Sequence, residues 1–242
     1  MKNKKDRIAK FIAQRSGFSR REIEAMIKQS RITVNDIEID TPVCFVSSAD
    51  QIAIDGNKIE FKDNIKTEVW CFYKPVDILC SNNGDGGKKT IYDILPKNMH
   101  HLKYIGRLDY KSEGLLLLTN NGYLINNITN PKARVSRKYL VKVFGYITQE
   151  KLDSLAFGIT VDRVKYRPIL ADIKTQHGKQ VWINFELTEG KNNEIRNICA
   201  HLGLTVRRLI RTHFHAIHIG ELNSAGFYKL TNNELNVLKE FL

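Results

Sequence analysis

The sequence predicts an α+β protein, in which a small helix–helix–strand unit precedes a larger domain with a mixed, mostly antiparallel β-sheet and flanking helices. Two short amphipathic segments open the chain. Apolar runs typical of strands follow at irregular intervals, and these runs outnumber the helical segments without alternating with them. We therefore expect domains over residues 1–62 and 69–242, joined by a polar linker at 63–68.

The first unit begins with helical periodicity over residues 6–15, which ends before Gly17. The next segment, Ser19-Arg20-Arg21-Glu22, has the capping-box pattern, with Ser19 as N-cap and Glu22 at the third helical position. It predicts a second helix. Short alternating runs then predict strands at 31–35, 43–46 and 51–54.

The larger region reads as strands separated by turns and a few helices. Apolar or alternating runs predict strands at 69–73, 115–119, 139–144, 181–187, 206–210 and 214–219. Helical periodicity with a following glycine predicts helices at 149–157 and 194–202. A second capping box, Thr231 to Glu234, predicts a terminal helix.

Composition is typical of a soluble globular protein. Of the 242 residues, 42% are hydrophobic and 26% are charged, which argues against disorder throughout. The aliphatic run at 115–118 is far shorter than the roughly 20 residues that span a membrane. The polar, basic N-terminus has no apolar segment typical of a secretory signal, so we expect a cytoplasmic protein without a membrane partner.

The net charge of +12 and the isoelectric point near 9.5 favour a polyanionic partner, with nucleic acid ahead of membrane and acidic protein. The distribution of charge sharpens this inference. Residues 1–31 hold ten basic and three acidic side chains, whereas residues 32–66 hold three basic and seven acidic ones. This pattern indicates a localised basic face at the start of the chain.

No metal site is predicted. The four cysteines, Cys44, Cys71, Cys80 and Cys199, form no Cys-x-x-Cys pair, and we expect reduced, mostly buried thiols. His213 and His215 would share one face of a strand and His218 the other, with no carboxylate or cysteine nearby to complete a ligand set.

The start of the second helix is a candidate anion site. Arg20 and Arg21 stand where free backbone N–H groups already favour a phosphate, and their guanidinium groups add bidentate contacts. A solvated charged helix without a ligand is the alternative. The order and spacing from Arg7 through Ser19–Glu22 to Arg31–Asn35 resemble the S-four RNA-binding module, named after a small-subunit ribosomal protein. The resemblance implies RNA contacts from the following residues: Arg7, Arg15, Ser19, Arg20, Arg21 and Arg31.

The second candidate site is Gly106-Arg107-Leu108-Asp109, followed by residues 112–122. A carboxylate in a turn before a buried strand is held rigidly and can act as a nucleophile or base, although turn-capping is the commoner use of Asp. The run resembles the catalytic motif of the pseudouridine synthases that modify ribosomal RNA and carry an S-four domain.

Further segments resemble this family in the same order. These are residues 72–75, 137–141, 187–196 and 208–211. The resemblance implies catalytic roles for Asp109, Tyr139 and Arg196: Asp109 acts as nucleophile or base, Tyr139 stacks on the target base, and Arg196 pairs with the Asp109 carboxylate. It also implies that Arg107 fills the gap left by the flipped nucleotide and that Lys191 and Asn192 contact RNA. No cofactor and no metal are implied.

Four positions depart from the family pattern. The family usually has Gly at Asp77 and at His215, Asp at Asn121, and Arg at Asn197. None of these departures removes the Asp, Tyr or Arg that the chemistry needs.

The resemblance implies an enzyme that isomerises a specific uridine to pseudouridine in ribosomal RNA, and its details are closest to the large-subunit (23S) synthases of the B type. The expected partner is ribosomal RNA, free or within pre-ribosomal particles, bound by a monomer. Two alternatives stay open: the same reaction on 16S RNA, and a non-catalytic RNA-binding protein of ribosome assembly.

Overall fold

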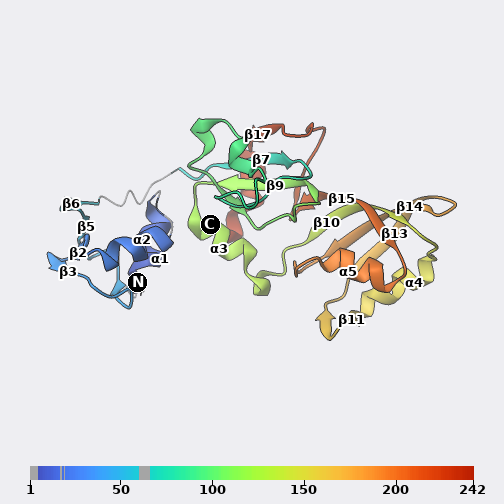
Figure 1. The fold of residues 1–242 in the computed structure, drawn as a ribbon, viewed down its shortest axis with the longest axis horizontal. Helices are drawn as coiled ribbons and strands as arrows, with labels where there is room; N and C mark the ends of the chain where they lie inside the picture. The colour runs from blue at the N-terminus through green and yellow to red at the C-terminus, as the bar shows by residue number, and fades with distance from the viewer. Residues whose placement is uncertain (1–4, 17, 19, 60–65) are drawn as a thin grey trace. The chain divides into compact units, whose positions relative to one another are not determined.

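The computed structural model describes residues 5–16, 18, 20–59 and 66–242 (Figure 1). It divides into two compact units, Met1–Thr67 with Asn121–Tyr123, and Glu68–Asn120 with Leu124–Leu242. Each unit has its own hydrophobic core. No helix in the described part of the chain is both long and apolar enough to cross a membrane.

The smaller unit packs two helices on an antiparallel sheet. Its elements are α1 (Ile8–Arg15), α2 (Arg20–Lys28), and a sheet in the order β3 (Ile37–Glu38), β2 (Ile32–Val34), β5 (Ile52–Ile54) and β6 (Asn57–Lys58). Apolar residues at helical spacing, including Ile8, Ile12, Ile23 and Ile27, are fully buried between the helices and the sheet. Amphipathic burial, rather than helix propensity, therefore stabilises these short helices.

The first helix starts at Ile8, two residues later than predicted. The reason is that Asp6 and Arg7 form a short strand, β1 (Asp6–Arg7), which pairs with β4 (Phe45–Val46). The predicted N-cap of the second helix, Ser19, lies outside the described residues, as does part of the predicted linker.

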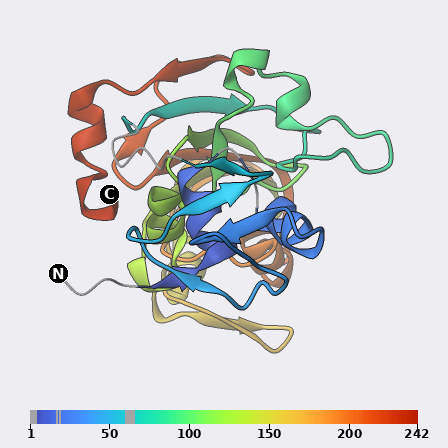
Figure 2. The same cartoon turned by 90° about the vertical axis from the view of Figure 1, so that its left-hand side faces the viewer.

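The larger unit is built on one mostly antiparallel sheet, whose strands are labelled in Figure 1; Figure 2 gives the same ribbon turned by 90°. Its strand order is β13 (Leu170–His177), β14 (Gln180–Leu187), β10 (Arg137–Phe144), β15 (Thr205–Phe214), β9 (Glu113–Thr119), β7 (Val69–Lys74) and β17 (Phe227–Lys229). β16 (Ile217–His218) pairs with β15, and β8 (Lys103–Ile105) pairs with β9. β15 and β9 run parallel. The expected α+β class with a mixed sheet is confirmed.

Helices cover both faces of this sheet, and a separate hairpin stands beside it. The helices are α3 (Gly122–Thr129), α4 (Gln149–Asp153), α5 (Glu194–His201) and α6 (Asn232–Asn236), with 3-10 turns at Ile91–Asp93, Lys97–Met99, Pro131–Ala133, Ser154–Phe157 and Lys239–Phe241. The hairpin is β11 (Ile159–Val161) and β12 (Val164–Tyr166). Thr231 and Glu234 form the predicted capping box of α6.

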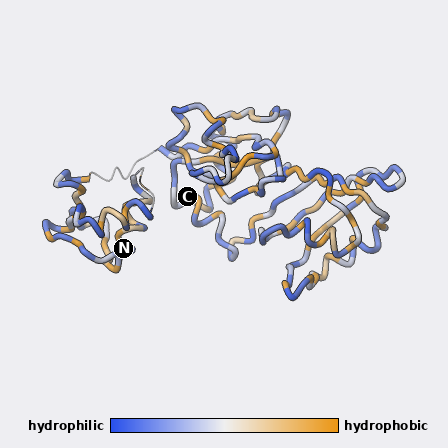
Figure 3. The backbone as a smooth tube through the Cα atoms, viewed as in Figure 1, coloured by the Kyte–Doolittle hydropathy of each residue, from blue (hydrophilic) through white to orange (hydrophobic). Residues whose placement is uncertain are grey.

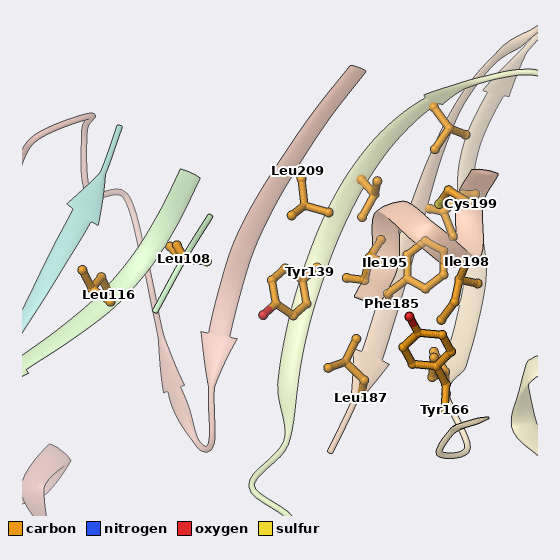
Figure 4. Packing of buried hydrophobic residues seen from close by; sticks show 14 of the residues in the cluster. Leu108, Leu116, Tyr139, Tyr166, Phe185, Leu187, Ile195, Ile198, Cys199 and Leu209 are labelled. Carbon is orange, nitrogen blue, oxygen red and sulfur yellow. The ribbon is translucent and has the colours of Figure 1, made fainter. Parts of the chain in front are cut away.

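The two sheet faces bury two cores, because side chains alternate along each strand. One core joins Tyr139, Val141 and Val143 of β10 to α5 (Figure 4). The other joins Leu115 and Leu117 of β9 to α3 and the C-terminal segment. Figure 3 shows hydrophobic and hydrophilic residues interspersed along the chain.

Several element predictions needed correction. The predicted strands at 206–210 and 214–219 are one strand, β15, and the short β16 after a turn. The predicted helix at 149–157 is α4 followed by a 3-10 turn, and it ends at Gly158 with φ of 79°. β13 was not predicted, because this edge strand is largely exposed and lacks apolar alternation. α3 was missed because Asn and Gly at its start favour a turn.

Gly114 allows β9 and β15 to approach closely. Its φ is 104°, and it pairs with Arg211 across the parallel ladder. A Cβ atom here would collide with the carbonyl oxygen of Arg211 and lie 2.8 Å from its amide nitrogen. A glycine is therefore required where the strand that follows Asp109 meets β15.

Candidate active site

A cavity of about 400 Å³ opens in the larger unit at the start of β9 and β10. It is lined by the turn before β9, by β10 and β15, by the loop after β14, and by the start of α5. The cavity brings together these predicted site residues: Arg107, Asp109, Tyr139, Lys191, Asn192 and Arg196. They come from segments up to 89 positions apart in the sequence, so the fold assembles them.

Asp109 occupies a tight turn at the mouth of β9. The Ser112 amide donates to the Asp109 carbonyl at 3.0 Å, which closes the turn. Leu108, the preceding residue, is buried, whereas Asp109 is partly exposed to the cavity. The backbone around the carboxylate is thus held while the side chain stays accessible.

The buried ammonium of Lys74 holds this turn through hydrogen bonds to its main chain. Its Nζ donates to the carbonyl oxygens of Ser112 at 2.8 Å, Asp109 at 3.2 Å and Pro75 at 2.8 Å. Lys74 is fully buried, and burial lowers its pKa to about 8. Three carbonyl dipoles and the nearby Asp109 charge offset the cost of burying this cation.

A second contact fixes the outer side of the turn. The Asp77 amide donates to the Tyr110 carbonyl at 2.8 Å, and the Asp77 carboxylate lies 2.7 Å from the Lys111 ammonium.

Asp77 has φ of 61° and His215 has φ of 54°. Both departures from the family glycines therefore stand at left-handed positions, which Asp and His adopt more readily than most residues.

Tyr139 forms part of an apolar wall of the cavity. It is 9% exposed, and Figure 4 shows it near Leu187, Leu209 and Ile195, with its hydroxyl directed away from Phe185. These leucine and isoleucine side chains also line the cavity. A planar aromatic ligand fits beside such a wall, because ring stacking and apolar contact both favour it.

Arg196 does not form the expected ion pair. Its Nη2 donates to the Lys111 carbonyl at 2.8 Å, and within the described residues no carboxylate lies within 4.0 Å of it. The prediction of an Arg196–Asp109 salt bridge is therefore corrected for this state of the site. The start of α5 places the guanidinium beside the Asp109 turn, but the main chain of that turn accepts its hydrogen bond.

Two further arginines line the cavity, and both were missed as site residues. Arg211 is 1% exposed; its Nε donates to the Leu115 carbonyl at 2.7 Å, and its Nη2 is buried without a partner among the described residues. Arg137 is half-buried, and burial lowers its pKa. Strand alternation could have found Arg137, because it lies two residues before Tyr139 and so shares its face.

The loop after β14 holds a cluster of acidic and basic groups. Lys191 Nζ lies 3.0 Å from the Glu189 carboxylate, so this predicted RNA contact already has a partner. Asn192 lines the cavity beside it. Glu194 is buried; its Oε2 accepts from the Lys191 amide at 2.9 Å, whereas its Oε1 has no partner in the part of the chain that is described. Burial and the nearby Glu189 charge raise the pKa of Glu194 to about 7.

The predicted RNA-binding arginines of the smaller unit fall into three groups. Arg20 and Arg21 are exposed at the first turn of α2. Arg31 instead forms a bidentate pair with Asp55, at 2.7 and 2.6 Å. The remaining guanidinium groups lie over aromatic rings, Arg7 over Phe45 and Arg15 over Phe11.

Within the described residues, no group of three or more His, Cys, Asp or Glu side chains could hold a metal ion. The predicted placement of the histidines was wrong. β15 ends at Phe214, and His215 lies in the following turn, so His213 faces His218 across the hairpin with ring centroids 4.3 Å apart.

Residues 68–201 match the family model described as RNA pseudouridylate synthase. The chain is 33% identical to the ribosomal large subunit pseudouridine synthase B of Yersinia pestis, over 98% of this chain and 76% of that protein. It is 32% identical to an uncharacterized RNA pseudouridine synthase of Rickettsia typhi, over 95% and 93% of the two chains.

A solved structure is similar in fold over nearly the whole chain. It is a crystal structure of a pseudouridylate synthase, with a TM-score of 0.68 and 25% identity, covering 96% of this chain and 99% of that one.

Replacing Lys74 with Met should lower the free energy of unfolding by about 1–3 kcal/mol. Three carbonyl oxygens lose their donor, and the relief of desolvation recovers only part of that loss. Lys111→Met is the control, because its exposed ammonium pairs with Asp77 at the surface and should contribute less than about 1 kcal/mol. Urea unfolding of both variants checks this; equal losses would contradict the role of Lys74.

Replacing Glu194 with Gln should change how stability depends on pH. The pKa of Glu194 in the folded chain is about 7, above the ordinary value of 4.5, so the unfolded chain loses this proton at lower pH. The contribution of Glu194 to the free energy of unfolding therefore falls as pH rises from about 4.5 to 7. The free energy of unfolding of wild type should therefore fall by about 1–3 kcal/mol relative to that of Glu194→Gln across this pH range.

The measurement is urea unfolding of wild type and variant at pH 4.5, 6 and 7.5. Glu150→Gln, at an exposed position of α4, is the control and should leave the difference nearly independent of pH. A constant difference between wild type and Glu194→Gln would show that the Glu194 proton is not linked to folding.

Proposed function

The chain belongs to the RNA pseudouridylate synthase family, and we propose that it isomerises one uridine of large-subunit (23S) ribosomal RNA to pseudouridine, with Asp109 as the central catalytic group. The observation that carries this proposal is the Asp109 turn, held by Lys74 at the edge of a cavity that also contains Tyr139 and Arg196. The relatives named ribosomal large subunit pseudouridine synthase B, from Yersinia pestis and Salmonella typhi, support the choice of RNA.

The reaction conserves every atom of the nucleotide. The bond between N1 of uracil and the sugar carbon breaks, the base turns, and C5 bonds to the same carbon, while the C5 proton is lost and N1 gains one. Asp109 serves in one of two ways, by attacking the sugar carbon or by removing a sugar proton. In either case an accessible carboxylate on a rigid turn is what the step needs.

The cavity suits a single nucleotide taken out of its RNA helix. Its volume of about 400 Å³ is in the range of small-ligand sites, and an enzyme that acts on a base must extrude it first. Tyr139 would stack on the uracil, and Arg107 would occupy the gap in the RNA. Arg137, Arg211 and Arg196 would supply positive charge to the sugar–phosphate backbone around it.

Arg196 would also act after a rearrangement. Its guanidinium donates to the Lys111 carbonyl, two residues beyond Asp109, and we infer that it turns toward the carboxylate once RNA has bound. The positive charge would then keep Asp109 ionised and oriented.

We place RNA binding in the smaller unit, as an S-four-like module spanning residues 1–62. The exposed Arg20 and Arg21 at the start of α2 and the basic excess in residues 1–31 support this. The substrate would be ribosomal RNA, free or within pre-ribosomal particles, bound by a monomer in the cytoplasm.

Asp109→Asn should abolish pseudouridine formation while RNA binding survives, because the amide is nearly isosteric but neither ionised nor nucleophilic. Asp77→Asn is the matched control: it removes a carboxylate on the other side of the same turn and tolerates the left-handed backbone. It should keep activity within about threefold of wild type, since an exposed ion pair contributes little.

The assay maps pseudouridines in 23S and 16S RNA from cells without the gene that express each variant. A site in 23S RNA that depends on Asp109 is the expected result. A site in 16S RNA would move the reaction to the small subunit. Pseudouridine formed at a measurable rate by Asp109→Asn would contradict the catalytic assignment.

Replacing Arg20 and Arg21 with Ala should weaken RNA binding and reduce its salt dependence. If each guanidinium meets one phosphate, the slope of log affinity against log salt should fall by up to about two. Lys58→Ala, on the edge strand β6 of the same unit, should leave the slope nearly unchanged. Filter binding to a 23S RNA fragment at several salt concentrations checks this; an unaltered slope in the double variant would show a merely solvated face.

A further inference from the structure

A cluster of exposed aromatic and basic side chains lies outside the cavity, at the far end of β10. Phe144 is the last residue of β10 and is 42% exposed, and Tyr146, which follows the strand, is 70% exposed. Trp182 of β14 lies opposite Lys142 of β10. Several large aromatic side chains exposed together at the end of a sheet indicate a surface that binds a partner.

Basic groups lie over each of these rings. The Lys179 ammonium is 5.9 Å from the ring centre of Phe144 and 5.0 Å from that of Tyr146. The Arg207 guanidinium is 5.7 Å from the Phe144 ring. The Lys142 ammonium is 5.9 Å from the Trp182 ring. We call these residues the aromatic–cation cluster: Lys142, Phe144, Tyr146, Lys179, Trp182 and Arg207.

A β-bulge brings Arg207 into the cluster. The pairing of β10 with β15 shifts between Lys142, opposite Arg208, and Val143, opposite Val206, so Arg207 is the extra residue. Regular alternation would expose only one of the two adjacent arginines, but both are exposed. The bulge therefore redirects Arg207 to the open face, as bulges commonly do at functional surfaces.

The cations of the cluster lack acidic partners. Among the described residues, no carboxylate lies within 4.0 Å of Lys142, Lys179 or Arg207. On the same strands Lys138 lies 3.1 Å from Glu186, and Arg208 lies 2.6 Å from Glu113. Positive charge is thus neutralised at Lys138 and Arg208, whereas the cations of the cluster have no carboxylate partner among the described residues.

We propose that the aromatic–cation cluster binds a single-stranded segment of RNA, with bases stacked on Phe144 and Tyr146 and phosphates held by Lys179 and Arg207. Aromatic faces interleaved with cations bind unpaired RNA without strong sequence preference, since every base has a face to stack and every nucleotide a charge. An acidic protein would need the cations but not the exposed rings. The proposal rests on an RNA substrate, the proposed function given above.

The cluster is separate from the catalytic cavity. Phe144 is five residues beyond Tyr139 on β10, about 17 Å at strand spacing, and it points to the opposite face of the sheet. The bound segment would therefore lie well outside the target nucleotide. Its effect should be on the affinity for long RNA rather than on the chemical step.

The test measures binding of the full chain to a fluorescein-labelled, unstructured 12-nucleotide RNA. Phe144→Leu with Tyr146→Leu keeps apolar bulk and removes the stacking faces, and it should weaken binding by about fivefold or more. Lys179→Ala with Arg207→Ala should lower the salt slope by about 1.4. Phe157→Leu is the matched control, because this ring is 91% exposed with no cation over it in the described structure; it should bind as wild type.

Ultraviolet cross-linking to the same RNA, read by mass spectrometry, should identify peptides containing Phe144 or Tyr146. Wild-type affinity in both double variants, or cross-links confined to other parts of the chain, would overturn the proposal. So would unchanged RNA affinity together with lost binding of a purified ribosomal protein, which would assign the cluster to a protein partner.

The pseudouridine assay separates this proposal from the proposed function. If no ribosomal RNA site depends on the chain, yet the double variants still lose affinity for the 12-nucleotide RNA, the cluster stands and the function fails. If the site is modified by wild type and the variants bind RNA normally, the function stands and the cluster fails.

Discussion

The buried ammonium of Lys74 is the interaction on which the site depends. It joins the end of β7 to the turn that carries Asp109 through the carbonyl oxygens of Asp109 and Ser112, and it also donates to the carbonyl of the neighbouring Pro75. The contact is to the main chain of Asp109, so the carboxylate is left accessible to the cavity. A salt bridge from Lys74 to the Asp109 carboxylate would have oriented the carboxylate but left its oxygens less accessible to a substrate. Burying a cation costs free energy, and the lowered pKa of Lys74 is a measure of that cost.

Much of the site could be predicted from the sequence, because the family motifs occur in the expected order and each contains a site residue. The Gly106–Asp109 run, Tyr139 and Arg196 were assigned from segments far apart in the chain, and the fold lines one cavity with them. The strands with strong apolar periodicity were also predicted, since burial on one or both faces leaves that pattern. β13 was not predicted, because a largely exposed edge strand has no apolar periodicity.

Side-chain direction and burial of charge could not be predicted in the same way. Lys74 and Arg211 lie in strands and are buried, whereas a charged residue in a sequence is ordinarily taken as exposed. The partner of Arg196 depends on a rotamer, which spacing does not determine. The composition likewise does not show which cations are free, and Arg31 and Lys191 are each paired with a carboxylate, that of Asp55 and that of Glu189. The positive charge available to RNA is therefore concentrated in fewer places than the composition indicates.

The close approach at Gly114 has a consequence for how such an enzyme can acquire new substrates. On this side of the cavity the spacing between β9 and β15 is set by main chain against main chain, and no side chain can be inserted to widen or narrow it. The loop after β14 also lines the cavity, but its buried Glu189 and Glu194 accept hydrogen bonds from main-chain amides, so this part of the wall is constrained as well. Divergence in target choice should accordingly accumulate in the surfaces that hold distant RNA, while the wall beside Gly114 keeps its shape.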